Sequence, residues 1–168
     1  MTKLIFGIAA VVLIGVGAVV VLGGGADVRA NEQAVATVLD DWHAAAAAAE
    51  EDRYFGHMTE DAVFLGTDAS ERWTKVQFRA YAHPHFARGK AWSFRSVHRG
   101  VSFSADGAVA WFDEDLATPN LGSCRGSGVL VHDGRVWKIA QYNLSVPIPN
   151  GVFDQVKKII MDAGAAKP

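Results

Sequence analysis

The chain has 168 residues, a formal net charge of −2 and a single cysteine, Cys124. So small a charge, without any basic run, argues against a nucleic-acid-binding surface. One cysteine excludes an intramolecular disulfide, so the folded part must be stabilised by its core alone. Apolar residues make up 50% of the sequence, and many of them lie near the N-terminus.

The first thirty residues predict export across a membrane. Residues 4–26 contain no charged side chain, and Lys3 precedes them. The apolar run 4–22 is longer than that of a signal peptide, about 7–15 residues, and close to the ~20 residues that span a bilayer. Small-x-small sequences at 24–26 and 28–30 are candidate cleavage sites. The segment is therefore either a cleaved signal peptide or an anchor in the cytoplasmic membrane, and both place the remainder in the periplasm or another extracytoplasmic space.

Composition divides the chain into three parts. Residues 1–30 form the leader and a short glycine linker. Residues 31–150 are predicted to form one domain, because roughly 138 residues after the leader suffice for one good core and are too few for two domains. Residues 151–168 carry an apolar stripe opposite charged side chains, which predicts an amphipathic C-terminal helix. The high alanine content and the uncharged leader are typical of a bacterial protein.

Three helices are predicted inside the domain: a short one around residues 54–58, and two longer ones with clear start signals. Asn31 is a suitable N-cap for the first of the longer helices, and apolar residues recur at helical spacing over 35–49. The second of them begins at a capping box, residues 74–77. We expect it to end at His83, because Pro84 disfavours helical geometry at the residue before it.

The second half of the chain is predicted to form a sheet. A short buried strand at 62–65 comes first, and Asp-Gly pairs at 106–107 and 133–134 mark hairpins. Strand formers occupy the segments 92–97, 101–104, 108–116, 123–132 and 135–144. Helices segregated from an antiparallel sheet make an α+β fold. A curved antiparallel sheet wrapped round the long N-terminal helix would leave a conical cavity.

Three segments also look familiar: 59–68 (TEDAVFLGTD), 73–86 (WTKVQFRAYAHPHF) and 133–143 (DGRVWKIAQYN). In this order they resemble the SnoaL-like (ketosteroid isomerase-like) branch of the nuclear transport factor 2 superfamily. The resemblance implies a nuclear transport factor 2-like cone. Members include isomerases, polyketide cyclases, dehydratases and association domains, so the fold by itself does not choose a function.

Two aspartates are candidate general bases. In ketosteroid isomerase-type members a carboxylate just after the first strand acts as the base, and the resemblance carries that role to Asp68; otherwise Asp68 caps a turn. Asp113 lies on the predicted strand 108–116, where alternation puts carboxylates on both faces. Either Asp113 or its neighbour Glu114 must therefore face the cavity, and the sequence leaves open which.

Five residues are predicted to contact a ligand: Trp42, Tyr54, Arg125, Gln141 and Asn143. Trp42 and Tyr54 would contribute aromatic side chains to the wall of the pocket. Arg125 would bind an anionic group if its strand face turns inward, and would otherwise form a surface ion pair. Gln141 and Asn143 share a strand face with two apolar residues, as in a pocket wall that is dry at one end, or else they satisfy buried backbone groups.

No metal or cofactor is expected. The histidines of His83-Pro84-His85 lack a third ligand at metal-binding spacing, and no P-loop, dinucleotide glycine pattern or nucleophile elbow is present. Where isomerase-type relatives place a tyrosine on the first helix, this chain has Trp42 and His43. The sequence therefore predicts a module that binds a small apolar or amphipathic ligand. The alternatives are a proton-transfer enzyme with a carboxylate base and an association domain that forms a homodimer through its sheet.

Overall fold

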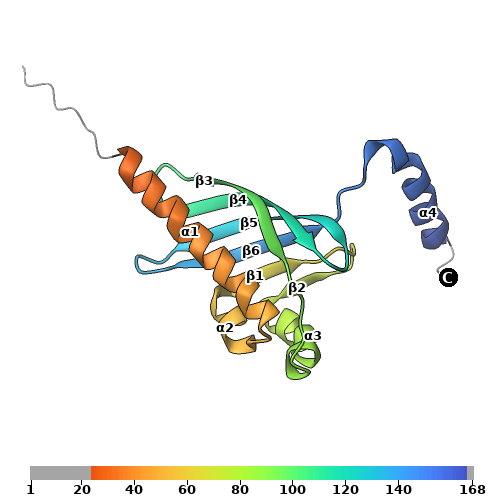
Figure 1. Cartoon of the computed structure of the whole chain (residues 1–168), viewed down its shortest axis with the longest axis horizontal. Coiled ribbons are helices and arrows are strands. Elements are labelled where there is room, and N and C mark those ends of the chain that lie inside the picture. The colour runs from red at the N-terminus through yellow and green to blue at the C-terminus, as the bar shows by residue number, and fades with distance from the viewer. Residues whose placement is uncertain (1–23, 166–168) are drawn as a thin grey trace, which may run out of the picture.

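The computed structural model describes residues 24–165, in which helices segregate from one curved sheet (Figure 1). The predicted leader, residues 4–22, lies outside the described residues. Among the helices of the described part, none is long and apolar enough to cross a membrane.

The sheet has six strands in the order β2-β1-β6-β5-β4-β3. Its strands are β1 (Met58–Leu65), β2 (Arg72–Thr74), β3 (Arg95–Phe103), β4 (Val109–Thr118), β5 (Gly122–His132) and β6 (Trp137–Ser145). Strands β3 to β6 form the predicted antiparallel meander, and β1 joins it parallel to β6. This confirms the α+β prediction of a curved sheet with a long N-terminal helix.

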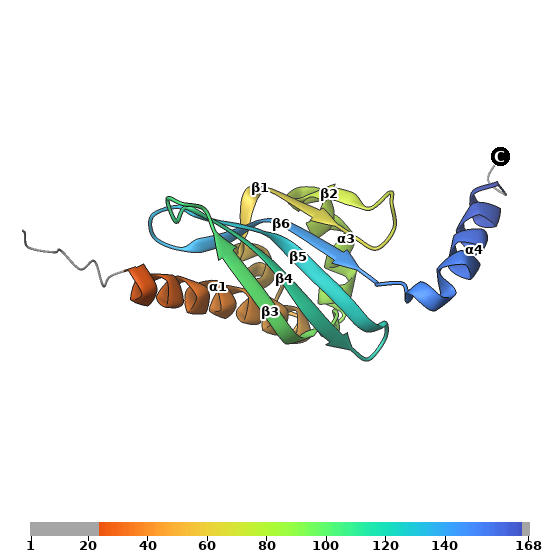
Figure 2. The same cartoon turned by 90° about the horizontal axis from the view of Figure 1, so that it is seen from above.

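Three helices cover the inner face of the sheet. The long α1 (Gly24–Ala47) lies along that face (Figure 2). The short α2 (Glu51–Gly56) packs against α1 and α3 (Lys75–Ala87), and α3 packs on β1 and β2. The core forms between them, from residues such as Leu39, Phe78, Leu130 and Ile139. No described helix covers the outer face in either view.

The start of α1 differs from the prediction. The helix already runs at Gly24, so Asn31 lies inside it and is not its N-cap. Glycine in a helix costs only about 1 kcal/mol relative to alanine, and no proline stops the chain between residues 24 and 31. A helix fixed by the buried Val35 and Leu39 therefore extends back to Gly24, into the predicted glycine linker.

The end of α3 also differs, although its start is as predicted. Thr74 and Gln77 form the expected capping box. The helix then continues through Pro84 to Ala87, where the prediction ended it at His83. The reason is tertiary packing: Phe86, in the turn after Pro84, is buried against Tyr54, with ring centroids 5.4 Å apart. Burial of a large aromatic ring compensates for the backbone hydrogen bond that proline cannot donate.

A bulge in β6 decides which of its side chains face inward. Val129 of β5 pairs with Gln141, but the next residue, Leu130, pairs with Ile139, which leaves Ala140 as an extra residue. Side chains alternate along a strand, so one extra residue reverses the alternation beyond it. Ile139 faces inward before the bulge, and Tyr142 faces inward after it.

The amphipathic C-terminal helix is present as α4 (Phe153–Ala165). A short 3₁₀ turn, Asn150–Val152, leads into it. In both views α4 stands away from the sheet (Figures 1 and 2), and its apolar side chains Ile159 and Ile160 are exposed.

Candidate functional site

A cavity of about 220 Å³ opens between the helices and the inner face of the sheet. Its walls are mainly aromatic and come from α1, α2, β1, β2, α3, β6 and the segments between them. They include Trp42, Tyr54, Phe64, Trp73, Trp92 and Tyr142. Apolar walls with a few polar groups are the usual composition of a small-molecule site.

Several of the wall rings share one orientation. Phe64 stacks on Phe78 at 3.9 Å and 16°, and it lies 5.8 Å from Tyr142 at 14°. Phe78 and Trp92 are 5.9 Å apart and tilted by 21°. Offset-stacked rings attract one another, and further flat groups pack best parallel to them. The cavity is therefore shaped to accept a flat molecule.

A buried carboxylate, that of Glu114, lies beneath this cavity. Glu114 points inward from β4 and is 0% exposed. Its Oε1 is 2.8 Å from His43 Nε2 and accepts a hydrogen bond of 3.0 Å from the Tyr142 hydroxyl. Its Oε2 accepts hydrogen bonds from Arg99 Nε and Nη2, at 3.0 and 2.8 Å. Four donor groups therefore surround one carboxylate.

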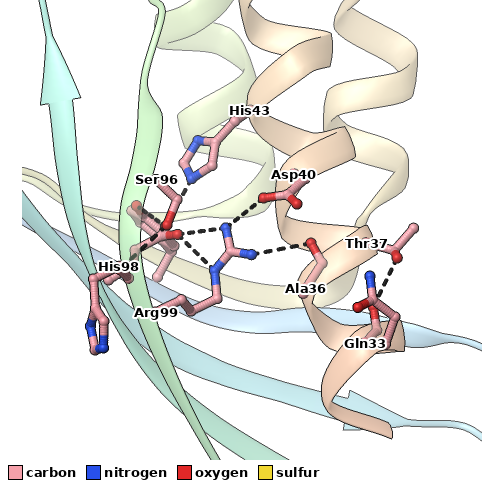
Figure 3. Close-up of polar contacts among 10 residues, drawn as sticks. Gln33, Ala36, Thr37, Asp40, His43, Ser96, His98 and Arg99 are labelled. Carbon is pink, nitrogen blue, oxygen red and sulfur yellow. Dashed lines mark hydrogen bonds and ion pairs between the residues drawn. The ribbon is translucent and has the colours of Figure 1, made fainter. Parts of the chain in front are cut away.

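Arg99 ties this cluster to α1. Figure 3 shows its guanidinium between β3 and the helix, directed toward Asp40 and the Ala36 carbonyl. Nη2 donates to Asp40 at 2.8 Å and Nη1 to the Ala36 carbonyl at 3.3 Å. The guanidinium thus holds Glu114 and the His43 helix in one fixed arrangement.

The charges of the cluster follow from these contacts. Burial disfavours ionisation of Glu114, but His43 and Arg99 outweigh burial and lower the pKa of its carboxyl below the ordinary value. Burial, with the nearby Glu114 carboxylate, raises the pKa of Tyr142 well above its ordinary value. Glu114 is therefore an anion at neutral pH, and the Tyr142 phenol keeps the proton that it donates.

The ionised Glu114 also fixes the proton on His43. A carboxylate is only an acceptor, so His43 Nε2 carries the hydrogen of their shared bond. In the neutral ring Nδ1 then holds the lone pair. His43 lines the cavity, and its ring lies 5.1 Å from that of Trp42. The arrangement is a histidine oriented by a buried carboxylate beside an aromatic cavity, which is suited to proton transfer.

Two other wall residues have buried donor groups without an acceptor. Within residues 24–165, neither the Tyr54 hydroxyl nor the Trp42 indole N–H has an acceptor for its proton. Burial raises the pKa of Tyr54 well above its ordinary value, although the Trp92 indole, which can only donate to the Tyr54 oxygen, acts in the opposite direction, so the hydroxyl keeps its proton. A buried polar group left unpaired costs about 1–3 kcal/mol.

The predicted bases lie away from this cavity. Asp68 is exposed in the turn after β1, where its carboxylate accepts hydrogen bonds from the Ser70 backbone and hydroxyl at 2.8 and 2.5 Å. Asp113 is exposed on the outer face of β4, while its neighbour Glu114 faces inward. Of the two neighbouring carboxylates on β4, it is therefore Glu114 that faces inward. The exposed positions of Asp68 and Asp113 do not suit a general base in this cavity.

The predicted ligand contacts divide in a similar way. Trp42 and Tyr54 line the cavity. Arg125 is exposed on the outer face, 3.7 Å from Asp115. Gln141 and Asn143 come after the bulge in β6, pair with outward residues and do not line the cavity. None of these three residues lies in the wall of this cavity, and Arg125 takes the alternative of a surface ion pair.

Sequence reasoning missed two members of the Glu114 cluster. Unbroken alternation from Lys138 would put Tyr142 on the face opposite Gln141 and Asn143, and the bulge breaks that alternation. Arg99 contacts α1 across 59 residues of sequence, at Asp40, which no local pattern encodes. The sequence did contain one signal for this cluster, namely a carboxylate on each face of β4. Whichever of the two faces inward needs buried hydrogen-bond donors around it.

Comparison with known proteins gives a family match over most of the domain. The model of the SnoaL-like domain family matches residues 35–149. No curated protein sequence matches the chain. Similar solved structures include a nuclear transport factor 2-like protein of unknown function from Pseudomonas putida, with 13% identity and a TM-score of 0.60, covering 73% of this chain and 90% of that one.

Two further structures carry names that suggest an activity. A candidate scytalone dehydratase from Novosphingobium aromaticivorans is 12% identical, with a TM-score of 0.61, and the match covers 73% of this chain and 89% of that one. A candidate ketosteroid isomerase from Parabacteroides distasonis is 14% identical, with a TM-score of 0.55, and the match covers 68% and 86%. At such identities the likeness shows a common fold only.

Proposed function

The chain belongs to the SnoaL-like domain family, and we propose that its cavity binds a small, flat, mainly apolar molecule that carries an oxygen acceptor. The flat shape follows from the shared orientation of the wall rings, and the acceptor from the groups left unpaired in the wall. This proposal keeps the ligand-binding prediction and adds the polar atom that orients the ligand.

The observation that carries the proposal is a pair of donors without acceptors at an aromatic cavity. Tyr54 and Trp42 stack on each other at 4.7 Å, and neither the hydroxyl proton of Tyr54 nor the indole N–H of Trp42 has an acceptor among the described residues. A site built to hydrogen-bond a ligand oxygen leaves such groups unpaired when it is empty. The size of the cavity, about 220 Å³, suits one substituted ring, since a cavity of roughly 150 Å³ holds benzene.

The test compares two probes of similar shape, acetophenone and ethylbenzene, by isothermal titration calorimetry of the purified full chain. Acetophenone should bind more tightly, because only it presents an oxygen. Tyr54→Phe should weaken acetophenone binding about 5-fold, which corresponds to one hydrogen bond of about 1 kcal/mol. Trp111→Phe, on the outer face, is the control and should have no effect. Failure of wild-type protein to bind either probe would reject the proposal.

A second candidate function, proton transfer, is favoured by the His43–Glu114 pair. His43 Nδ1 would accept a proton from carbon next to the ligand carbonyl, and the imidazolium formed would be stabilised by Glu114. The enolate oxygen would accept hydrogen bonds from Tyr54 and Trp42. Support also comes from structures of the same fold that are named as a candidate dehydratase and a candidate isomerase.

Exchange of carbon-bound hydrogen tests this second function separately from binding. In D₂O the full chain should catalyse deuterium incorporation into the methyl group of acetophenone, followed by NMR. His43→Gln should lower that rate about 100-fold or more, while acetophenone still binds. Asp113→Asn should leave it unchanged. Binding without any exchange above the buffer rate would leave a binding module and reject catalysis.

Export is also proposed, on the strength of the sequence alone. Lys3 and the uncharged residues 4–26 support it. Mass spectrometry of the N-terminus of protein recovered from cells checks it: a new terminus near residue 27 or 31 indicates cleavage. An intact N-terminus in the membrane fraction indicates an anchor, and an intact N-terminus in the soluble cytoplasmic fraction would contradict export.

A further inference from the structure

The rim of the cavity carries one carboxylate, that of Glu71, in the turn between β1 and β2. The turn is closed by backbone hydrogen bonds from Gly66 N–H to the Glu71 carbonyl at 2.8 Å and from Glu71 N–H to the Asp68 carbonyl at 2.9 Å. Both Glu71 and Gly66 line the cavity. The Glu71 backbone is therefore held on both sides while its side chain lies at the opening.

Gly66 allows this carboxylate to lie where it does. Glu71 Oε2 accepts a hydrogen bond of 3.2 Å from the Asp68 backbone. It also occupies the space above Gly66, where an added Cβ would come within 2.1 Å of it. Any residue other than glycine at position 66 would have to displace the carboxylate from the rim. The turn thus places a negative charge at the opening of the cavity.

The part of the chain that the structure describes supplies no ion-pair partner for Glu71. Within residues 24–165 no lysine or arginine forms an ion pair with it, and none lines the cavity. His85, which also lines the cavity, has its Nδ1 3.1 Å from Arg88 Nη2. The carboxylate at the rim has no neutralising partner in the described part of the chain.

The rings beside Glu71 favour a positive charge as well. Trp73 follows it by two residues and stacks on Tyr81 at 4.6 Å, and both rings line the opening. The faces of electron-rich rings attract ammonium groups, and tryptophan does so most strongly. A carboxylate without a counter-ion next to such rings is the chemistry that recognises an ammonium group.

We propose that the ligand of this cavity is a small aryl-alkylammonium compound. Its cation lies at the rim between Glu71 and the Trp73 face, and its flat body extends inward. An oxygen at the far end of that body reaches the unpartnered groups of Tyr54 and Trp42. This inference rests on the proposed binding function and adds the charge of the ligand and its direction in the cavity.

The test uses two probes that differ only in charge. Tyramine carries an ammonium group where tyrosol carries a hydroxyl, and both present a phenol oxygen at the other end. Calorimetric titration of the full chain should show tyramine binding on the order of ten-fold more tightly than tyrosol, with the difference shrinking as salt is raised. Glu71→Gln keeps the acceptor for the Asp68 N–H and should bring the two affinities together. Glu32→Gln, which removes an exposed charge on α1, is the control and should preserve the preference.

The outcomes separate this inference from the function on which it rests. Equal affinities in the wild-type protein, or tyramine binding that is unaffected by Glu71→Gln, would reject the ammonium ligand and leave a cavity for neutral molecules. If neither probe nor the neutral ketone binds to protein with a native circular dichroism spectrum, both proposals fail. A fall in tyrosol affinity equal to that of tyramine in Glu71→Gln would show that the substitution merely disturbs the turn, and would also count against the inference.

Discussion

Glu114 and Asp113 are neighbours on β4 and have opposite surroundings. Asp113 is exposed on the outer face, beside Gly100. Glu114 is fully buried and receives hydrogen bonds from His43, Tyr142 and Arg99. Burying a charge is costly unless it is paired and hydrogen-bonded. The inner face therefore supplies the hydrogen-bond donors that a buried carboxylate needs, whereas the carboxylate on the outer face relies on solvent.

The largest expected effect comes from removing the inner carboxylate. Among the described residues, Glu114→Ala leaves the mostly buried Arg99 with the exposed Asp40 as its one remaining ion-pair partner, so we expect a loss of about 3–5 kcal/mol in the free energy of unfolding. Asp113→Ala, one residue away, should change it by no more than about 0.5 kcal/mol. Urea unfolding followed by tryptophan fluorescence measures both. Equal losses of stability at the two positions would contradict the conclusion that the inner carboxylate stabilises the fold and the outer one does not.

Two glycines on β5 and β3 provide the same contrast without a change of charge. A Cβ at Gly126 would lie 2.1 Å from the Tyr142 hydroxyl and 3.0 Å from Glu114 Cγ, whereas one at Gly100 would lie 3.4 Å from an Asp113 oxygen. Gly126→Ala should therefore cost about 1–3 kcal/mol of stability, because the cluster must shift. Gly100→Ala should be close to neutral, and thermal unfolding of the two variants compares them. A neutral Gly126→Ala would mean that the cluster is loosely packed.

Removing a single hydroxyl should have a smaller effect. Tyr142→Phe deletes one hydrogen bond to Glu114 and leaves three donors in place, so we expect a loss of about 1–1.5 kcal/mol. Tyr81→Phe, at an exposed ring, is the matched control and should be silent in the same denaturation experiment. If the control loses as much stability, the effect belongs to tyrosine in general and not to this carboxylate.

The pH dependence of stability should show the smallest effect. The pKa of Glu114 is lowered in the folded protein from an ordinary value of 4.5. Its contribution is therefore present above that value and is lost as pH falls through the lower folded pKa. As pH falls below 4.5 the wild type should lose more stability than Glu114→Gln, because only the wild type loses this ionised carboxylate. Asp113→Asn should follow the wild-type profile, and a Glu114→Gln profile parallel to the wild type would contradict the assigned shift.

Local signals in the sequence were enough for the order of elements. The capping box at Thr74 and Gln77 and the Asp-Gly hairpins act over a few residues, and the structure follows them. The alternation on β4 likewise required a carboxylate on each face. These features could be predicted because the residues that cause them lie next to one another in the chain.

The remaining features depend on residues that are far apart. The passage of α3 through Pro84 depends on Phe86 packing against Tyr54, which lies in another helix. The cluster around Glu114 needs His43, 71 residues away in the sequence, and Arg99, 15 residues away. No single-sequence pattern states which of two adjacent carboxylates meets such partners, so Asp113 could not be distinguished from Glu114 before the structure.

The bulge at Ala140 makes this part of the sheet sensitive to length. Loss of one residue there would turn Tyr142 toward solvent and bring Gln141 and Asn143 into the interior. Exchange of Ala140 for another small residue would leave every neighbour on its present face. In β6, therefore, the length of the chain between Ile139 and Gln141 is constrained more strongly than the identity of the residue at position 140.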